Sequence, residues 1–302
     1  MKNVVLIDFN NLCFRALFSK DVDIKNDPKF SLWRYFVFDS IYKTLWLDRN
    51  INEVVVAIDN KNTWRKAYFP RYKESRKKQR DDKIDWECVF KEMVNLSREL
   101  KHHMPFKVLQ IRSAEADDII AVVSLHTNNK CIIVSNDEDY NQLCSDRVKV
   151  YNPTKKKYIQ CSNPQGFVID KCLLGQPKDD IFNVITPDNW GKTEQTEGKR
   201  KPGFGEKALR EVKTIGYKKW LSDRGRYKKY DVEVDPEKNF HRNRVLIDFQ
   251  KIPNTIVDRV MDQYLNTTYP PPDNIYQFFK KHNMREYLEK YHMVENRLMK
   301  MY

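Results

Sequence analysis

The sequence predicts an α/β protein with a mostly parallel central sheet flanked by helices. The runs VVLIDF at 4–9, EVVVAIDN at 53–60 and CIIV at 131–134 are short and apolar, as in strands covered on both faces. Helical patterns separate these strands, which is the order of right-handed parallel βαβ units. With 302 residues, the chain can bury a core in one large domain with a subdomain, or in two domains.

The other elements follow from apolar periodicity and from Pro, Gly and capping residues. In chain order we expect a helix from about 11, a helix at 31–48, a helix from about 71 through 86–100, a helix capped by Ser113, a strand at 147–151, a helix at 164–174 ending at Gly175, a loop at 186–202, and helices over 243–302.

Three of the predicted strands end in an aspartate: Asp8, Asp59 and Asp137. One such aspartate is commonplace, because Asp is a good turn former. In a parallel sheet, however, the carboxyl ends of strands lie at one edge, where ligands bind. We therefore expect the three carboxylates to converge on a shared site.

Further acids lie close by in the sequence: Glu115, Asp117 and Asp118 at a helix start, and Asp139 just after Asp137. The helix dipole favours first-turn carboxylates, so a plain charged helix start is the alternative for the first group. Clustered carboxylates repel one another unless cations or water relieve the charge. Their oxygens suit Mg²⁺ or Mn²⁺, and two such ions about 4 Å apart can drive phosphodiester hydrolysis.

Composition narrows the class of protein. The net charge of +13 favours a polyanionic partner. All eight glycines lie at or after Gly166, which excludes a P-loop or a GxGxxG motif from the first half. The six cysteines form no CxxC pair, no signal-peptide layout opens the chain, and no apolar run approaches 18 residues. We expect a cytosolic protein that does not bind membranes.

The segment 63–83 is basic and aromatic. From 65 to 83 it holds nine basic and three acidic residues, interleaved with Tyr68, Phe69 and Tyr72, and Pro70 interrupts it. A solvated helical face is the simple interpretation. The functional interpretation is a clamp whose cations bind phosphates and whose aromatic rings stack on single-stranded bases.

A second candidate for phosphate binding is PGFGEKALR at 202–210. Its Gly-x-Gly turn opens a predicted helix, so backbone amides near Gly203 and Gly205, with Lys207, could hold a phosphate. An ordinary helix-opening turn has the same pattern. The segment also resembles the hairpin of helix-hairpin-helix DNA-binding elements.

Several motifs in this order resemble the 5′-nuclease family, which includes flap endonucleases and the 5′-nuclease domains of bacterial DNA polymerase I. They are VVLIDFNNLCFRALF, VVVAIDN, WRKAYFPRYKESRKK, AEADDIIA, VSNDEDYNQL and PGFGEKALREV. RNRVLIDFQKIP and PPPDNIYQFF resemble the T-even phage ribonuclease H branch. The resemblance implies a SAM-fold, PIN-like nuclease domain at 1–180 with a helical arch at about 63–90. A helical C-terminal domain at 181–302 would carry a helix-hairpin-helix-like element at about 199–230.

The resemblance also implies roles for individual residues. Ligands of two Mg²⁺ ions, with Mn²⁺ as a substitute, would be Asp8, Asp59, Glu115, Asp117, Asp118, Asp137, Asp139 and Asp179. Catalytic roles would belong to Lys73, Arg76, Asp117 and Asp137. DNA-binding residues would be Arg65, Lys66, Arg71, Tyr72, Lys73, Arg76, Lys77, Gly203, Gly205 and Lys207. One departure is that Gln176 and Pro177 follow Gly175 where the family often has an aspartate, which leaves the choice between Asp179 and Asp180 open.

The implied function is a Mg²⁺-dependent 5′ to 3′ exonuclease, flap endonuclease and ribonuclease H that removes RNA primers and 5′ flaps during replication. Partners would be flap, nicked or forked DNA, RNA–DNA hybrid, and a single-stranded-DNA-binding protein or sliding clamp, although no clamp motif is present. We expect a monomer, in the host cytoplasm for a phage-encoded chain. The alternatives are a PIN-type ribonuclease and a non-catalytic, structure-specific DNA-binding protein; the latter would leave the clustered carboxylates unexplained.

Overall fold

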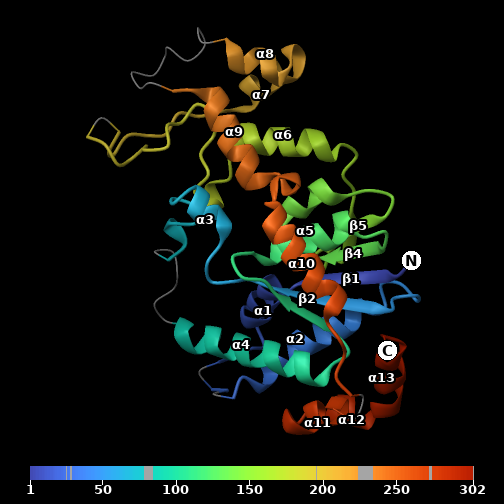
Figure 1. The fold of residues 1–302 in the computed structure, drawn as a ribbon. Coiled ribbons are helices and arrows are strands. Elements are labelled where there is room, and N and C mark those ends of the chain that lie inside the picture. The colour runs from blue at the N-terminus through green and yellow to red at the C-terminus, as the bar shows by residue number, and fades with distance from the viewer. Residues whose placement is uncertain are drawn as a thin grey trace. The chain divides into compact units, whose positions relative to one another are not determined.

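The computed structural model describes residues 1–24, 26–27, 29–77, 84–194, 196–223, 234–271 and 274–301 (Figure 1). It divides into two compact units, each built from separate segments. The first unit comprises Met1–Thr63, Asp82–Cys161 and Pro253–Tyr302, and the second comprises Trp64–Asp81 and Ser162–Ile252. Both units are built from segments that alternate along the chain. The predicted domains at 1–180 and 181–302 are continuous in sequence, and this division stays a prediction.

The first unit is built on one sheet with the strand order β3-β2-β1-β4-β5-β6. In chain order the strands are β1 (Asn3–Asp8), β2 (Glu53–Ile58), β3 (Lys107–Gln110), β4 (Lys130–Val134), β5 (Val148–Asn152) and β6 (Lys157–Ile159). Neighbouring strands are parallel except β5 and β6, which are antiparallel. This confirms the predicted mostly parallel α/β fold.

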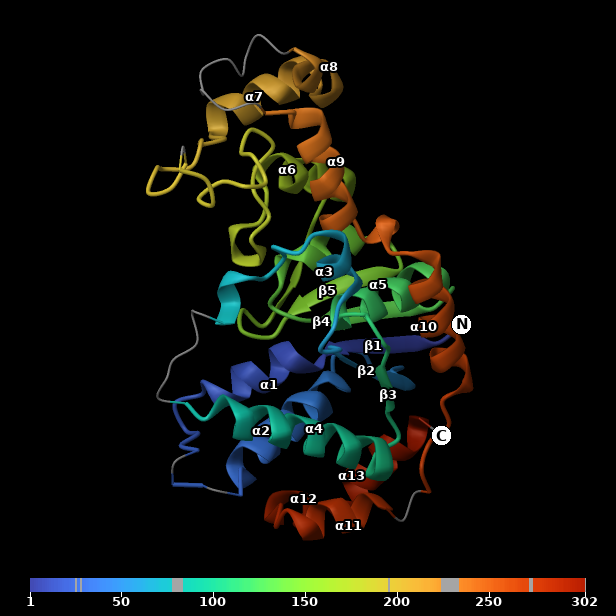
Figure 2. The same ribbon diagram turned by 60° about the vertical axis from the view of Figure 1, so that its left-hand side comes forward.

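Continuous apolar strands form because both faces of the sheet are covered. Val5 and Ile7 point to one face and Val4 and Leu6 to the other, and all four are at most 1% exposed. Figure 2 shows α1, α2 and α4 on one side of the sheet and α5 and α10 on the other. The helices of this unit are α1 (Phe9–Leu17), α2 (Ser31–Thr44), α4 (Trp86–His103), α5 (Ala116–His126), α10 (Asn254–Asn266), α11 (Asn274–Lys281), α12 (Arg285–Glu289) and α13 (Tyr291–Leu298), with 3-10 helices η2 (Glu138–Leu143) and η6 (Met299–Met301).

The second unit is helical and has its own core, to which Phe69, Phe204 and Trp220 contribute. The buried Asn243 joins two parts of this unit by donating to the carbonyls of Cys172 (2.7 Å) and Phe182 (2.8 Å). Its elements are α3 (Trp64–Tyr68), η1 (Ser75–Lys77), α6 (Pro164–Leu174), η3 (Pro177–Asp179), α7 (Glu206–Ile215), α8 (Tyr217–Ser222), α9 (Pro236–Ile247) and η5 (Phe249–Lys251).

Two local expectations were wrong, and the short strands β3 and β6 were missed. Residues 71–73 form a turn and 75–77 a 3-10 helix, so the helix predicted from 71 begins only at Trp86. The cap of α5 is Glu115, whereas Ser113 has a left-handed backbone (φ 67°) two residues before it. The strand β3 was not predicted, because its four residues lack a clear apolar run. Residues 78–83 of the predicted arch lie outside the described part of the chain.

Among the helices that the structure describes, none is both long and apolar enough to cross a membrane.

Candidate active site at the carboxyl edge of the sheet

The strand order defines where a site is expected. The chain runs outward from β1 through β2 to β3, and then returns to β4 on the other side of β1. Such a reversal is the point at which open α/β sheets bind ligands, beyond the carboxyl ends of their strands. Asp8 ends β1, Asp59 directly follows β2, and Asp137 lies three residues after β4. The three strands that were predicted to end in aspartate are therefore neighbours in the sheet.

Asp8 is 8% exposed and caps α1, with its Oδ1 accepting from the backbone N–H of Asn11 at 3.0 Å. Burial raises the pKa of Asp8 to about 7, and the nearby negative charges of Asp59 and Asp137 contribute to this rise. The hydrogen bonds from Asn11 and Tyr140 act in the opposite direction. The charges of the neighbouring carboxylates thus add to the effect of burial at Asp8.

Three acidic residues organise the start of α5. Asp59 accepts from the backbone N–H of Ala116 at 2.7 Å. Glu115 and Asp118 form a capping box, in which the N–H of Glu115 donates to Asp118 Oδ2 at 2.9 Å. Glu115 also accepts from the hydroxyl of Thr63 at 3.2 Å. Asp118 is fully buried, so the structure gives it a structural task beside the ligand role expected from the sequence.

Tyr140 lies between the carboxylates of Asp117 and Asp8. Its fully buried hydroxyl donates to Asp117 Oδ1 at 2.5 Å and approaches Asp8 Oδ2 at 3.4 Å. Burial, followed by the charges of Asp117 and Asp8, raises the pKa of Tyr140 well above its ordinary value, so the hydroxyl remains a donor. Sequence reasoning did not select Tyr140. The sequence did contain a signal for it: Tyr140 directly follows the acidic residues of NDEDY, and a buried tyrosine hydroxyl usually finds a hydrogen-bond partner.

Asp137 and Asp139 lie at the start of η2. Asp137 caps this 3-10 helix and accepts from the backbone N–H of Asp139 at 2.9 Å. The N–H of Asp137 in turn donates to Ser135 Oγ at 3.1 Å. Asp139 is 8% exposed, whereas Asp137 is half-buried. Short-range hydrogen bonds therefore fix the backbone that carries both carboxylates.

The donor set suits a hard divalent cation, since it consists of carboxylates, and the charges of Asp59 and Asp137 act on the buried Asp8. No three Asp, Glu, His or Cys side chains in the described ranges are arranged closely enough to form a preassembled metal site. Several of the carboxylates instead accept hydrogen bonds from backbone amides or from Tyr140. Ion binding would therefore reorient side chains on a backbone that is already in position.

The predicted ligand Asp179 belongs to the second unit and contacts the basic segment. The guanidinium of Arg76 pairs with its carboxylate, and its backbone carbonyl accepts from the N–H of Lys73 at 2.9 Å. Asp180 accepts from the N–H of Ser75 at 2.7 Å. The structure thus joins residues 73–76 to the last acidic motif within one unit.

The basic segment is only partly exposed. Arg65 is 2% exposed and donates to the carbonyl of Leu246 at 2.8 Å, a structural contact in place of the exposed position expected of a phosphate ligand. Arg71 donates to the carbonyl of Asp188 at 2.6 Å, and Tyr72 is 4% exposed in the core of the second unit. Lys66 and Arg76 are exposed, and the side chain of Lys77 lies outside the described part.

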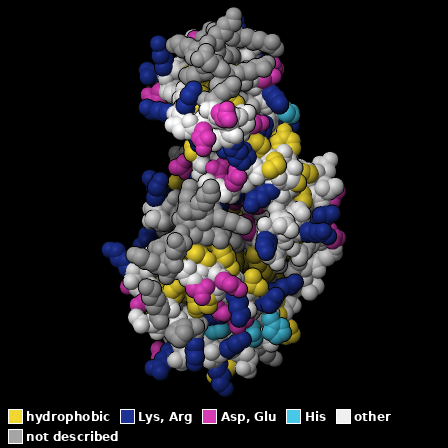
Figure 3. Space-filling model, turned by 90° about the vertical axis from the view of Figure 1, so that its left-hand side faces the viewer, with side chains coloured by type: hydrophobic (Ala, Val, Ile, Leu, Met, Phe, Trp, Pro, Cys, Tyr) yellow, Lys and Arg dark blue, Asp and Glu magenta, His cyan; other side chains and the backbone are white. Residues whose placement is uncertain are grey.

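The second candidate for phosphate binding, residues 202–210, includes the start of a helix, as predicted. Gly205 is the N-cap of α7, and no side chain satisfies the cap. Gly203, Gly205 and Lys207 are all exposed. The predicted element at 199–230 extends into residues 224–230, which lie outside the described ranges. Among the described residues on the face drawn in Figure 3, Lys and Arg side chains are spread among acidic ones.

The chain belongs to the 5′-nuclease family. Residues 3–171 match the family model of the 5′-3′ exonuclease N-terminal resolvase-like domain, and residues 163–293 match that of the T4 RNase H C-terminal region. Its homologues are hydrolytic enzymes that act on phosphodiester bonds, as the sequence motifs predicted.

Among individual relatives, the chain is 30% identical to ribonuclease H of Enterobacteria phage T4 over 293 residues, covering 93% of this chain and 92% of the relative. It is 26% identical to DNA polymerase I of Bacillus subtilis over 199 residues, which are 61% of this chain and 22% of the polymerase. A structure of the T5 5′-exonuclease with zinc has a TM-score of 0.62 at 19% identity, covering 88% of this chain and 99% of that one. This last similarity concerns the fold.

Proposed function

We propose that this protein is a Mg²⁺-dependent 5′ to 3′ exonuclease and flap endonuclease with ribonuclease H activity, which removes RNA primers and 5′ flaps during DNA replication. The observation that carries the proposal is the convergence of Asp8, Asp59 and Asp137 at the carboxyl ends of β1, β2 and β4. Burial, and after it the charges of Asp59 and Asp137, raise the pKa of Asp8, and a bound cation would relieve this unfavourable charge. The relatedness to phage T4 ribonuclease H supports the substrate class.

The proposed ligands are Asp8, Asp59, Glu115, Asp117, Asp118, Asp137 and Asp139, joined by Asp179 for a second ion. Bound Mg²⁺ would supply an activated water and would stabilise charge on the phosphate and leaving oxygen. The protein's own task is to hold the carboxylates in place. Tyr140 does so for Asp117 and Asp8 through its hydroxyl, and the caps of α1, α5 and η2 fix the backbone.

Basic residues would hold the substrate. Lys73 and Arg76 are proposed to contact the phosphate region near the cut, and Lys66 and the turn with Gly203, Gly205 and Lys207 to contact the nucleic-acid backbone. The substrates would be flap, nicked or forked DNA and RNA–DNA hybrid. We propose a monomer in the cytoplasm with a single-stranded-DNA-binding protein as partner.

The test uses a 5′-labelled flap duplex that contains an RNA segment, with Mg²⁺ or with EDTA. Short products that require Mg²⁺ and disappear with Asp137→Asn support the proposal. The exposed Asp146, outside the acidic cluster, offers the control Asp146→Asn, which should cleave normally. Tight binding without cleavage under Mg²⁺ or Mn²⁺ would favour the binding-protein alternative, and cleavage unaffected by Asp137→Asn would refute the site.

A further inference from the structure

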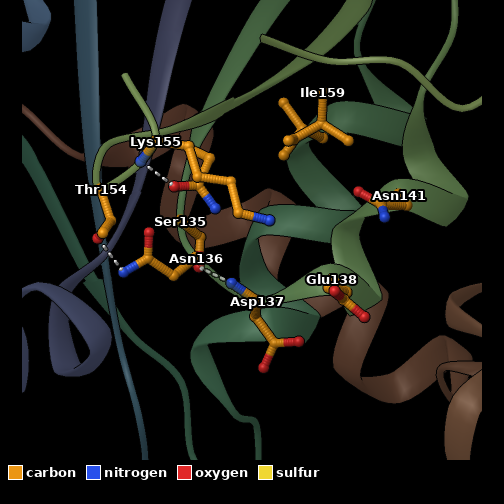
Figure 4. Close-up of a pocket in the computed structure, with 10 residues that line it drawn as sticks. Ser135, Asn136, Asp137, Glu138, Asn141, Thr154, Lys155 and Ile159 are labelled. Carbon is orange, nitrogen blue, oxygen red and sulfur yellow. Dashed lines mark hydrogen bonds between the residues drawn. The ribbon is translucent and has the colours of Figure 1, made fainter. Parts of the chain in front are cut away.

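A pocket of about 340 Å³ lies beside Asp137, at the carboxyl ends of β4 and β5 (Figure 4). Its walls come from the loop after β4, from η2, and from the turn that joins β5 to β6. The volume is within the range of small-molecule sites. Lys155, which lines the pocket and begins the basic run Lys155 to Lys157, has no part in the function proposed above.

One hydrogen bond between the two loops and one within the turn after β5 hold the pocket in shape. Asn136 Nδ2 donates to Thr154 Oγ1 at 2.9 Å, which ties the loop after β4 to the turn after β5. The backbone N–H of Lys155 donates to Asn152 Oδ1 at 2.8 Å, which closes that turn. A site whose polar groups are fixed in this way loses little conformational entropy when a ligand binds.

One polar atom in the wall lacks a partner. The Oδ1 atom of Asn136 is buried and accepts no hydrogen bond from any residue in the described ranges. A buried acceptor left unsatisfied is unfavourable, and a donor on a ligand would relieve this cost. An amino group of a base or a hydroxyl of a sugar is such a donor.

The remaining walls combine an apolar surface with a cation. Val150 and Ile159 supply the apolar surface, and Asn141 supplies a further amide. Figure 4 shows the side chain of Lys155 pointing into the pocket, where its ammonium group can meet an anion. This ammonium also argues against a metal ion as the occupant, although Asp137 and Glu138 are nearby.

We propose that this pocket binds one nucleotide of the substrate strand, next to Asp137. The base packs against Val150 and Ile159, a base or sugar donor binds Asn136 Oδ1, and a phosphate binds the ammonium of Lys155. The inference deepens the proposed nuclease function and rests on it for the identity of the substrate. Asn136 and Lys155 act as positioning residues for the strand that is cut.

The first experiment measures binding without cleavage. Adenosine 5′-monophosphate, adenosine and inorganic phosphate are each added to the full chain in EDTA. Saturation-transfer NMR follows the base protons of the two nucleoside probes, and isothermal calorimetry follows inorganic phosphate. The variants are Asn136→Ala and Lys155→Ala, with Lys157→Ala as the matched control, because Lys157 is an exposed lysine of the same run that does not line the pocket. Circular dichroism verifies that each variant is folded.

We expect saturation transfer to the base of adenosine 5′-monophosphate, about tenfold weaker binding in each pocket variant, and no change in Lys157→Ala. The same two variants should raise KM for the flap substrate while kcat stays near the parent value. Phosphate binding without transfer to the base, or equal loss in Lys157→Ala, would overturn the inference. Mg²⁺-dependent cleavage in a protein that binds no nucleotide would refute the pocket alone. Nucleotide binding in a protein that cleaves nothing would refute the nuclease proposal alone.

Discussion

Replacing Asp8 by Asn removes a buried negative charge while keeping a side-chain oxygen that can cap α1. Burial is the main reason that the pKa of Asp8 rises from 3.8 to about 7, and Asp59 and Asp137 add to it. Between these two values the metal-free folded protein holds a proton that the unfolded chain releases. The stability that this carboxyl contributes is therefore complete below pH 3.8 and is lost as the pH rises through 7.

The magnitude follows from the two pKa values. At about 1.4 kcal/mol per pH unit, the whole difference is about 4 kcal/mol, of which about 3 kcal/mol arises between pH 5 and pH 8. Asp8→Asn should therefore gain free energy of unfolding relative to the parent, and the gain should grow by about 3 kcal/mol over that range. The comparison between two pH values cancels effects of the substitution that do not depend on pH.

Urea unfolding followed by circular dichroism, in EDTA at pH 5, 6, 7 and 8, measures this gain. Asp146→Asn, at an exposed position outside the acidic cluster, is the control and should show no gain that grows with pH. Added Mg²⁺ should reduce or reverse the advantage of Asp8→Asn, because the cation stabilises the carboxylates of the parent. A gain that is equal at pH 5 and pH 8 would refute the electrostatic account of the cluster.

Other consequences can be measured separately. Tyr140→Phe removes the hydroxyl shared by two carboxylates, so cleavage should fall about tenfold and stability by about 1–2 kcal/mol; unchanged kinetics would contradict its orienting role. For Glu53→Gln, unfolding in urea should show a loss of about 3 kcal/mol at pH 7. Although burial opposes it, hydrogen bonds from Lys2 and Tyr264 lower the pKa of Glu53, so this loss should vanish as the pH falls well below 4.5. Arg76→Ala should reduce the slope of log affinity against log salt by about 0.9 for a flap duplex, whereas an unchanged slope would argue against a phosphate contact.

Much of the sheet and its acidic edge could be predicted because the signals are local. A strand covered on both faces needs a continuous apolar run, and parallel connections bring the ends of such runs to one edge. The sequence alone therefore suffices to group Asp8, Asp59 and Asp137. Their strands are neighbours in the sheet because the strand order reverses at β1, which places β2 and β4 on its two sides.

The details that sequence reasoning missed depend on tertiary contacts. Lys73 has a left-handed backbone (φ 56°), and its N–H bonds to Asp179 more than 100 residues later, so the expected helix does not form there. Tyr140 joins the site because its hydroxyl meets Asp117 and Asp8 from two other segments. Propensity rules describe neither kind of contact.

The discontinuous first unit has a consequence for biosynthesis. Ile275, Phe278 and Phe279 are fully buried against the same core as α2 and α4, yet they are synthesised some 200 residues later. On the ribosome, the apolar surfaces of α2 and α4 against which they pack must wait, partly bare, until residues 274–279 have emerged. Pairings between distant segments form slowly and expose apolar surface meanwhile. Truncation before α11 should therefore yield a chain that aggregates during synthesis, even though the acidic edge lies in the part already made.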